Sequence, residues 1–148
     1  MPPAKTTPPQ IAGLSLDGAA SVAISAVQNR ALCESLGVSP ADDGAAHPSF
    51  YFAITQIGMK LSVRELCAVC DFDVDDGPLL AGSEVTISGP LLVETPYYVR
   101  GEIVSLVRKM SRKLGAIDVL EYRLRLIDAR EHMALEAKNT WILPRDAA

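Results

Sequence analysis

The chain has 148 residues, of which 49% are hydrophobic and 22% are charged, which is the composition of one ordinary globular domain. Its formal net charge of −4 argues against nucleic acid as a general partner. No apolar run approaches the roughly 18 residues that a membrane-spanning helix needs. Lys5 is not followed by the apolar segment of a signal peptide. We therefore expect a cytoplasmic protein that binds neither nucleic acid nor a membrane.

The three cysteines form a small, odd set that is typical of reduced thiols inside the cell. Cys67 and Cys70 have the spacing of half a zinc site or of a redox pair. A zinc site needs about four ligands, but there is no second cysteine pair, and His47 and His132 lie far away in the sequence. We therefore expect buried structural thiols and no metal.

The first 13 residues predict a disordered or extended lead-in that is rich in proline. They contain Pro2, Pro3, Pro8 and Pro9 and show no hydrophobic period. Residues 14–148 are expected to form a single domain.

An amphipathic helix is predicted over Asp17–Leu36. Apolar residues recur there at helical spacing, at Ala20, Ile24, Val27 and Ala31. Asp17 is a suitable N-cap, and Gly37 supplies a stop at the other end. The helix is expected to lie on the surface of the domain and to be followed by a loop.

The first half of the stretch Ser49–Cys70 predicts a central, buried helix. Apolar side chains occupy nearly every side of it, and four fall at helical spacing: Phe50, Ile54, Ile57 and Leu61. A helix that is apolar all round must be enclosed by other elements. Either Ser49 as N-cap or Pro48 at the first position would begin the helix. Ser62 and Glu65 have capping-box spacing, which predicts a second short helix.

From Pro78 the hydrophobic period changes to two, which predicts strands. We expect one short strand and three long ones, over Ser83–Ser88, Tyr97–Arg108, Ile117–Asp128 and His132–Leu143. One face of the first long strand would carry Tyr97, Val99, Ile103 and Val107. The clearest alternation is in the next strand, where Leu120, Tyr122, Leu124 and Leu126 alternate with Glu121, Arg123 and Arg125. Such spacing predicts an antiparallel meander with one apolar and one polar face.

The order of these elements is that of the hot-dog fold, and residues 82–145 resemble the sheet-forming part of MaoC-like dehydratase and hydratase domains. The resemblance rests on Gly82-Ser-Glu and Gly89-Pro-Leu around the first strand, on Tyr98–Ile103, on the basic hairpin Lys109–Gly115 and on Trp141–Arg145. It implies an α+β domain in which a long central helix is wrapped by a curved antiparallel β-sheet.

The resemblance also implies a ligand and a reaction. Members of this family bind acyl thioesters of coenzyme A or of acyl carrier protein. Active members hydrate a 2-enoyl thioester to the (R)-3-hydroxyacyl product or run the reverse dehydration, without a cofactor. They act as dimers of hot-dog units or as two fused units. The chain is therefore expected to form a homodimer, or a heterodimer with another hot-dog unit.

Active members of the family carry an Asp-x4-His pair before the central helix, and Asp42 and His47 have that spacing here. The pair holds one water and moves its proton to the 2-carbon, while amides at a helix N-terminus stabilise the enolate oxygen. The family's Asn-Pro is absent here, and His47 adjoins the helix without the usual long intervening segment. The alternative is a degenerate unit, in which His47 only begins the helix. Such a unit shapes the acyl tunnel while a partner unit performs the chemistry.

Other residues are candidates for binding the ligand. Ala46 and the small residues before it would let a thioester carbonyl approach the first amides of the helix, at Ser49 and Phe50. Tyr97 would line the acyl tunnel or pack in the core, and Arg112 and Lys113 would bind coenzyme phosphates or form a solvated hairpin tip.

A thioesterase is a less favoured reading. Proteins of that class usually place a carboxylate in the central helix, whereas Ser49–Lys60 contains no Asp or Glu.

Overall fold

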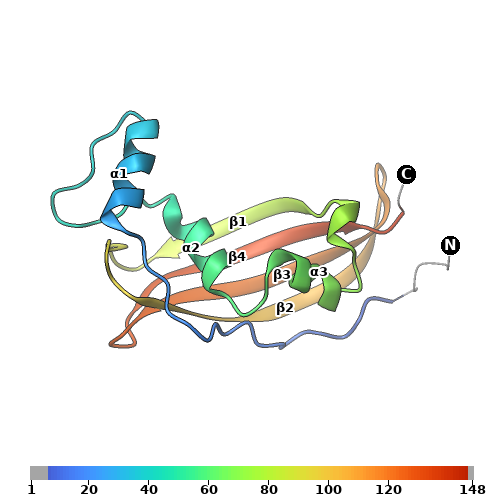
Figure 1. Ribbon diagram of the computed structural model, residues 1–148. Coiled ribbons are helices and arrows are strands. Elements are labelled where there is room, and N and C mark those ends of the chain that lie inside the picture. The colour runs from blue at the N-terminus through green and yellow to red at the C-terminus, as the bar shows by residue number, and fades with distance from the viewer. Residues whose placement is uncertain (1–6, 147–148) are drawn as a thin grey trace.

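The computed structural model describes residues 7–146, in which three helices lie beside a curved antiparallel sheet (Figure 1). The strands are β1 (Leu79–Ile87), β2 (Tyr97–Ser111), β3 (Gly115–Asp128) and β4 (Met133–Pro144). They pair in the order β1-β4-β3-β2, and every pairing is antiparallel. The helices are α1 (Ala26–Ser35), α2 (Phe50–Gly58) and α3 (Val63–Val69), with a short 3₁₀ turn, η1, at Val74–Asp76.

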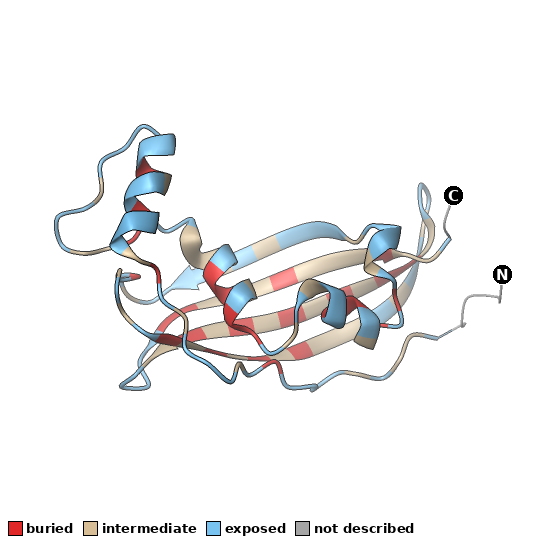
Figure 2. Ribbon diagram, viewed as in Figure 1, coloured by how far each residue is buried: buried red, intermediate tan, exposed pale blue. Residues whose placement is uncertain are grey.

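The alternation predicted for β3 is confirmed. Its inward side chains are at most 1% exposed: Leu120, Tyr122, Leu124 and Leu126. On the other face Arg123 and Arg125 form ion pairs with Glu102 and Glu136 of the neighbouring strands. Figure 2 shows buried residues alternating with half-buried ones along β3 and β4. One face of the sheet thus meets the helices, and the other carries a grid of paired charges.

The face predicted for the far end of β2 is wrong at Val107, which is 46% exposed. The pairing of β2 with β3 shifts between Ile103 and Ser105, where β2 carries one extra residue. A bulge of this kind turns every later side chain to the opposite face. Leu106 therefore packs against the core in place of Val107.

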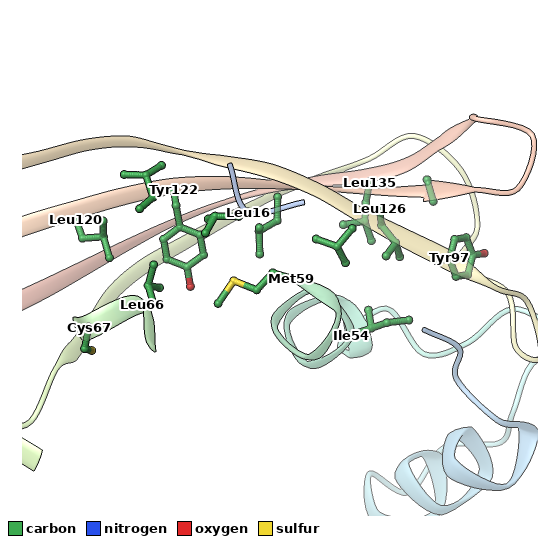
Figure 3. Packing of buried hydrophobic residues seen from close by; sticks show 14 of the residues in the cluster. Leu16, Ile54, Met59, Leu66, Cys67, Tyr97, Leu120, Tyr122, Leu126 and Leu135 are labelled. Carbon is green, nitrogen blue, oxygen red and sulfur yellow. The ribbon is translucent and has the colours of Figure 1, made fainter. Parts of the chain in front are cut away.

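The central helix α2 lies on the sheet, but the sheet does not enclose it on all sides. Ile54, Thr55 and Gly58 are its buried residues, and Figure 3 shows the side chains of Ile54 and Met59 on opposite sides of the helix end. Ile57 is 76% exposed, so the expected apolar stripe through Ile57 is wrong. The second helix follows as predicted, because Ser62 and Glu65 form a capping box at the start of α3.

The helix predicted from Asp17 begins only at Ala26. Ser25, not Asp17, is its N-cap, and Ser25 forms a capping box with Gln28. The predicted stop is confirmed, because Gly37 follows α1 with a left-handed φ of 72°.

Residues 13–22 run as an extended segment along the outer edge of β2. Their backbone N–H groups donate to β2 carbonyls from Gly13 to Ile103, from Gly18 to Val99 and from Val22 to Tyr97, at 2.8–2.9 Å. Pairing with residues 13–22 provides partners for backbone N–H and C=O groups at the outer edge of β2, which would otherwise be left without hydrogen bonds. A helix over the same residues would leave this edge unpaired.

Residues 1–6 of the predicted lead-in lie outside the described residues, and its end at residue 13 stays a prediction. In the described part of the chain, no helix is long and apolar enough to cross a membrane.

Candidate functional site

An apolar pocket of about 200 Å³ lies at the start of α2. Seven apolar residues line it: Ala45, Ala46, Pro48, Ile87, Pro90, Leu91 and Leu135. Two backbone hydrogen bonds hold the loop that precedes α2 against the segment after β1. They run from Ala46 N–H to Leu91 O at 2.6 Å and from Val93 N–H to Gly44 O at 2.9 Å. With no charged side chain in its lining, this apolar pocket suits a hydrocarbon group.

His47 and Ser49 form a tight turn beside the apolar pocket. The Ser49 backbone N–H donates to His47 Nδ1 at 3.2 Å, and the Ser49 hydroxyl lies 2.7 Å from the same nitrogen. Because an amide is only a donor, Nδ1 must accept, and the proton of the neutral ring is then on Nε2. Ser49 occupies the N-cap position of α2, but its side chain makes no capping hydrogen bond to the helix.

The backbone amides around His47 already have partners inside the protein. The His47 N–H donates to the buried Asn29 Oδ1 at 2.9 Å. The Phe50 N–H donates to His47 O and the Tyr51 N–H to Pro48 O, each at 3.1 Å. A thioester carbonyl would have to replace one of these bonds to reach the predicted amide of Phe50. The role of Asn29 was missed in the sequence, because a polar residue in an amphipathic surface helix carries no signal of burial.

Asp42 is exposed in the turn before the apolar pocket. Its neighbour Asp43 is engaged, because its Oδ1 accepts from the Ala45 N–H at 3.0 Å. Within residues 7–146, no hydrogen bond or ion pair joins Asp42 to His47. The catalytic role of this pair stays a prediction.

The other predicted ligand-binding residues lie apart from one another. Phe50 borders a second, smaller hollow of about 90 Å³ between α2 and the N-terminal segment. Tyr97 is 2% exposed, and its hydroxyl accepts from the Leu92 N–H at 2.9 Å, so it anchors the connection before β2. Arg112 and Lys113 lie in the β2–β3 hairpin, at the end of the sheet far from the start of α2 (Figure 1). Within a single chain, the cationic side chains of Arg112 and Lys113 therefore lie too far away to contact a ligand in the apolar pocket.

Sequence reasoning missed a group of six neutral polar side chains between α2 and the sheet, here called the polar cluster: Tyr51, Gln56, Ser83, Tyr122, Asn139 and Trp141. On one side Tyr51 OH donates to Ser83 Oγ at 2.9 Å, and Ser83 Oγ donates to Asn139 Oδ1 at 2.6 Å. The only signal was Asn139, a polar residue at an inward position of an alternating strand.

The other side of the polar cluster is centred on the Tyr122 hydroxyl. Trp141 Nε1 donates to it at 2.9 Å, and it donates to Gln56 Oε1 at 3.0 Å. Burial raises the pKa of the Tyr122 phenol above its usual value, and its hydrogen bonds act in the opposite direction. Tyr122 therefore stays a neutral hydrogen-bonding group at physiological pH.

No protein-family model matches this sequence, and no curated protein matches it either. Solved structures do match the fold. The HadBC (3R-hydroxyacyl-ACP dehydratase) complex from Mycobacterium tuberculosis matches with a TM-score of 0.69 at 15% identity, over 90% of this chain and 98% of that chain. The MaoC-like dehydratase from Rhodospirillum rubrum gives 0.60 at 14% identity, over 93% and 94%. The protein smu.793 from Streptococcus mutans, bound to acetyl CoA, gives 0.56 at 9% identity, over 92% and 86%.

The chain therefore has the α+β hot-dog fold, as the resemblance in its sequence predicted. It shares this fold with MaoC-like dehydratases and with HadBC. At these identities the likeness defines the fold, and the activity has to be argued from the residues of this chain.

Proposed function

We propose that this chain is the acyl-thioester-binding subunit of a hot-dog 2-enoyl hydratase or 3-hydroxyacyl dehydratase, in which a second hot-dog unit transfers the proton. The observation that carries this proposal is the apolar pocket at the start of α2, lined only by apolar side chains. The fold that the chain shares with the HadBC (3R-hydroxyacyl-ACP dehydratase) complex also supports an acyl ligand. The acyl group would occupy the apolar pocket, with its thioester at the opening.

The proposal of a binding subunit also rests on the state of the two predicted catalytic groups. Proton transfer needs an acid or base within hydrogen-bond reach of the reacting water. Asp42 is exposed and His47 Nδ1 is engaged with Ser49. A partner with its own carboxylate–imidazole pair would supply the missing group.

No strand within residues 7–146 pairs with the outer edge of β1, which supports assembly with a second hot-dog unit. β1 ends the sheet on one side, and it carries exposed apolar side chains at Leu79, Leu80 and Ile87, each 46–48% exposed. An unpaired strand edge of this kind is a template for another strand. The opposite edge, β2, is paired over part of its length with residues 13–22. We infer that the dimer forms along β1.

A self-sufficient hydratase is the second candidate, and the Asp-x4-His spacing of Asp42 and His47 favours it. In that case a change of the loop on substrate binding would bring the two side chains to one water. His47 Nε2 would then be the nitrogen that exchanges the proton, since Nδ1 accepts from Ser49.

Calorimetric titration with a saturated acyl-CoA, together with a hydration assay on the matching 2-enoyl-CoA, separates the candidates. We expect binding without turnover by the chain alone, and turnover when a catalytically competent hot-dog chain is added. Asp42→Asn and His47→Ala should then leave turnover by the mixture unchanged. Turnover by the chain alone that either variant abolishes would establish the second candidate. Release of free coenzyme A would instead indicate a thioesterase.

The location of the acyl site is tested by narrowing the apolar pocket. Ala46 is 6% exposed and lines it, so Ala46→Phe should abolish acyl-CoA binding. Ala31→Phe, on the exposed surface of α1, is the matched control and should bind as the unaltered chain does. Thermal unfolding of both variants checks that they are folded. Absence of acyl-CoA binding by the unaltered chain would refute the proposed function.

A further inference from the structure

The concave face of the β1–β4 ladder changes from apolar to polar along its length. Its opposed pairs are Ile87 with Leu135, Val85 with Ala137 and Ser83 with Asn139. Directly opposed residues of an antiparallel pair point to the same face. The β4 members of these pairs are buried on the side of α2, whereas Ser83 and Val85 of β1 are half-buried and Ile87 is 48% exposed. Ile87 and Leu135 line the apolar pocket, and Ser83 lies four residues further along β1, about 13 Å away at the rise of an extended strand. An apolar strip therefore leads from the apolar pocket to the polar cluster.

The polar cluster contains a buried amide donor, Asn139 Nδ2, that makes no well-formed hydrogen bond within residues 7–146. Asn139 is 0% exposed, its Oδ1 accepts from Ser83, and its Nδ2 lies near the Tyr122 hydroxyl without meeting any acceptor in hydrogen-bonding geometry among the described residues. An unsatisfied amide in a protein interior is costly, and an apolar side chain of similar size would avoid that cost. The donor is therefore available for an acceptor that comes from outside the chain.

The chemistry of that acceptor follows from the charge and burial of the polar cluster. Its six side chains carry no formal charge at neutral pH, so a buried carboxylate or phosphate would lack a counter-ion there. A neutral carbonyl or hydroxyl oxygen can accept from Asn139 Nδ2 without that penalty.

The polar cluster is also accessible from the side of β1. Tyr51, Gln56, Ser83 and Trp141 are only half-buried, so part of the polar cluster reaches the surface, and Ser83 of β1 contacts Asn139 directly. The hydrogen bonds of Tyr51 and Ser83 bridge the space between α2 and β1. Rotation of these hydroxyls would let a ligand oxygen approach Asn139.

We propose that the polar cluster recognises a neutral oxygen, carbonyl or hydroxyl, carried by the distal part of the acyl chain of the thioester, with Asn139 Nδ2 as the donor. This inference rests on the proposed function, and it narrows the ligand to oxygenated acyl chains. The thioester remains at the start of α2, the hydrocarbon part follows the strip from Ile87 to Val85, and the oxygen ends at Asn139.

The test is calorimetric titration with a series of acyl-CoA ligands of one chain length, unsubstituted or carrying a single oxo group at successive distal carbons. At least one oxo ligand should bind about tenfold more tightly than the unsubstituted one, which is what one additional hydrogen bond supplies. Asn139→Leu should abolish this preference, so that the oxo and unsubstituted ligands bind the variant with equal affinity. Thr140→Val, on the opposite face of β4, should keep the preference.

The outcomes separate this inference from the proposed function. If the unsubstituted ligand binds and no oxo ligand binds more tightly, the inference is refuted and the proposed function stands. Retention of the preference in a folded Asn139→Leu variant would also refute it. A crystal structure of the complex with a water on Asn139 Nδ2 and the ligand oxygen elsewhere would assign a structural water only. If no acyl-CoA binds at all, both proposals fail.

Discussion

Arg145 donates from Nε to the carboxylate of Asp118 at 2.7 Å and so ties the end of β4 to the buried side of β3. Asp118 is 0% exposed, and Arg108 of β2 donates to the same carboxylate. Arg145 also donates to the carbonyl oxygens of Cys70 and Asp71, which follow α3. One buried acid thus joins three strands and the end of a helix.

We predict that Asp118→Ala destabilises the protein by about 3–5 kcal/mol, since removal of one partner leaves buried charge unpaired. Urea unfolding followed by circular dichroism measures this change. Glu121→Ala is the control, because Glu121 pairs at 3.5 Å with the exposed Lys138 and should contribute less than about 1 kcal/mol. Equal losses in the two variants would contradict a special role for the buried acid.

We predict a loss of stability at high pH from two buried thiols, Cys67 of α3 and Cys70 directly after it. Burial raises the pKa of the Cys70 thiol to about 12 and also raises that of Cys67. A folded-state pKa above the unfolded one gives stability that is complete below about pH 8.5 and is lost as pH rises towards 12. The free energy of unfolding should therefore fall above about pH 9, by up to about 1.4 kcal/mol per pH unit for each thiol. Denaturant unfolding between pH 7 and 10.5 measures this.

A variant without the Cys70 thiol tests whether this group causes the fall in the free energy of unfolding at high pH. Cys70→Ala removes the titrating group, so its stability should fall less steeply with pH than that of the unaltered chain. Val69→Ala, next to Cys70 at the end of α3, removes no titrating group and is the control that should keep the full slope. An identical slope in Cys70→Ala would show that other groups cause the pH dependence.

We predict that residue 18 tolerates no side chain, because Gly18 packs directly against α2. A Cβ at Gly18 would overlap the carbonyl oxygen of Gly58, and the Gly18 N–H is held by Val99 O at 2.9 Å. Gly18→Ala should destabilise the protein by about 1–3 kcal/mol, the usual cost of overpacking. Gly82→Ala, where the new Cβ meets no atom within 4 Å, should change stability by less than about 1 kcal/mol. Thermal unfolding of both variants makes the comparison, and a tolerated alanine at residue 18 would contradict it.

The proposed assembly along β1 predicts different effects of charge at the two edges of the sheet. Replacement of Leu79 and Leu80 by Glu should convert a dimer to a monomer, because it places charge in the interface. Sedimentation velocity measures the mass. Val107→Glu on β2 is the matched control, since Val107 is 46% exposed, as Leu80 is. If the control dissociates instead, the interface lies at the β2 edge.

The sequence determined those parts of the fold that depend on neighbouring residues. The period of two from Leu120 to Leu126 set the inward face of β3, because successive side chains of any strand point to opposite faces. Ser62 and Glu65 set the start of α3, because both bonds of a capping box form within one turn. The pair Ser25 and Gln28 carried an equivalent signal, but the apolar spacing from Ala20 favoured an earlier start.

Tertiary structure alone decided the features that depend on distant partners. Residues 13–22 became extended because an unpaired edge of β2, some eighty residues away in the sequence, accepts their N–H groups. The extra residue between Ile103 and Ser105 turned Val107 outward, and only the pairing with β3 reveals it. The polar cluster at Asn139 likewise exists because β1, β3, β4 and α2 meet there. Local pattern sets the alternation of side chains along an uninterrupted strand, whereas pairing and packing between remote segments decide where a bulge reverses it and what each side chain meets.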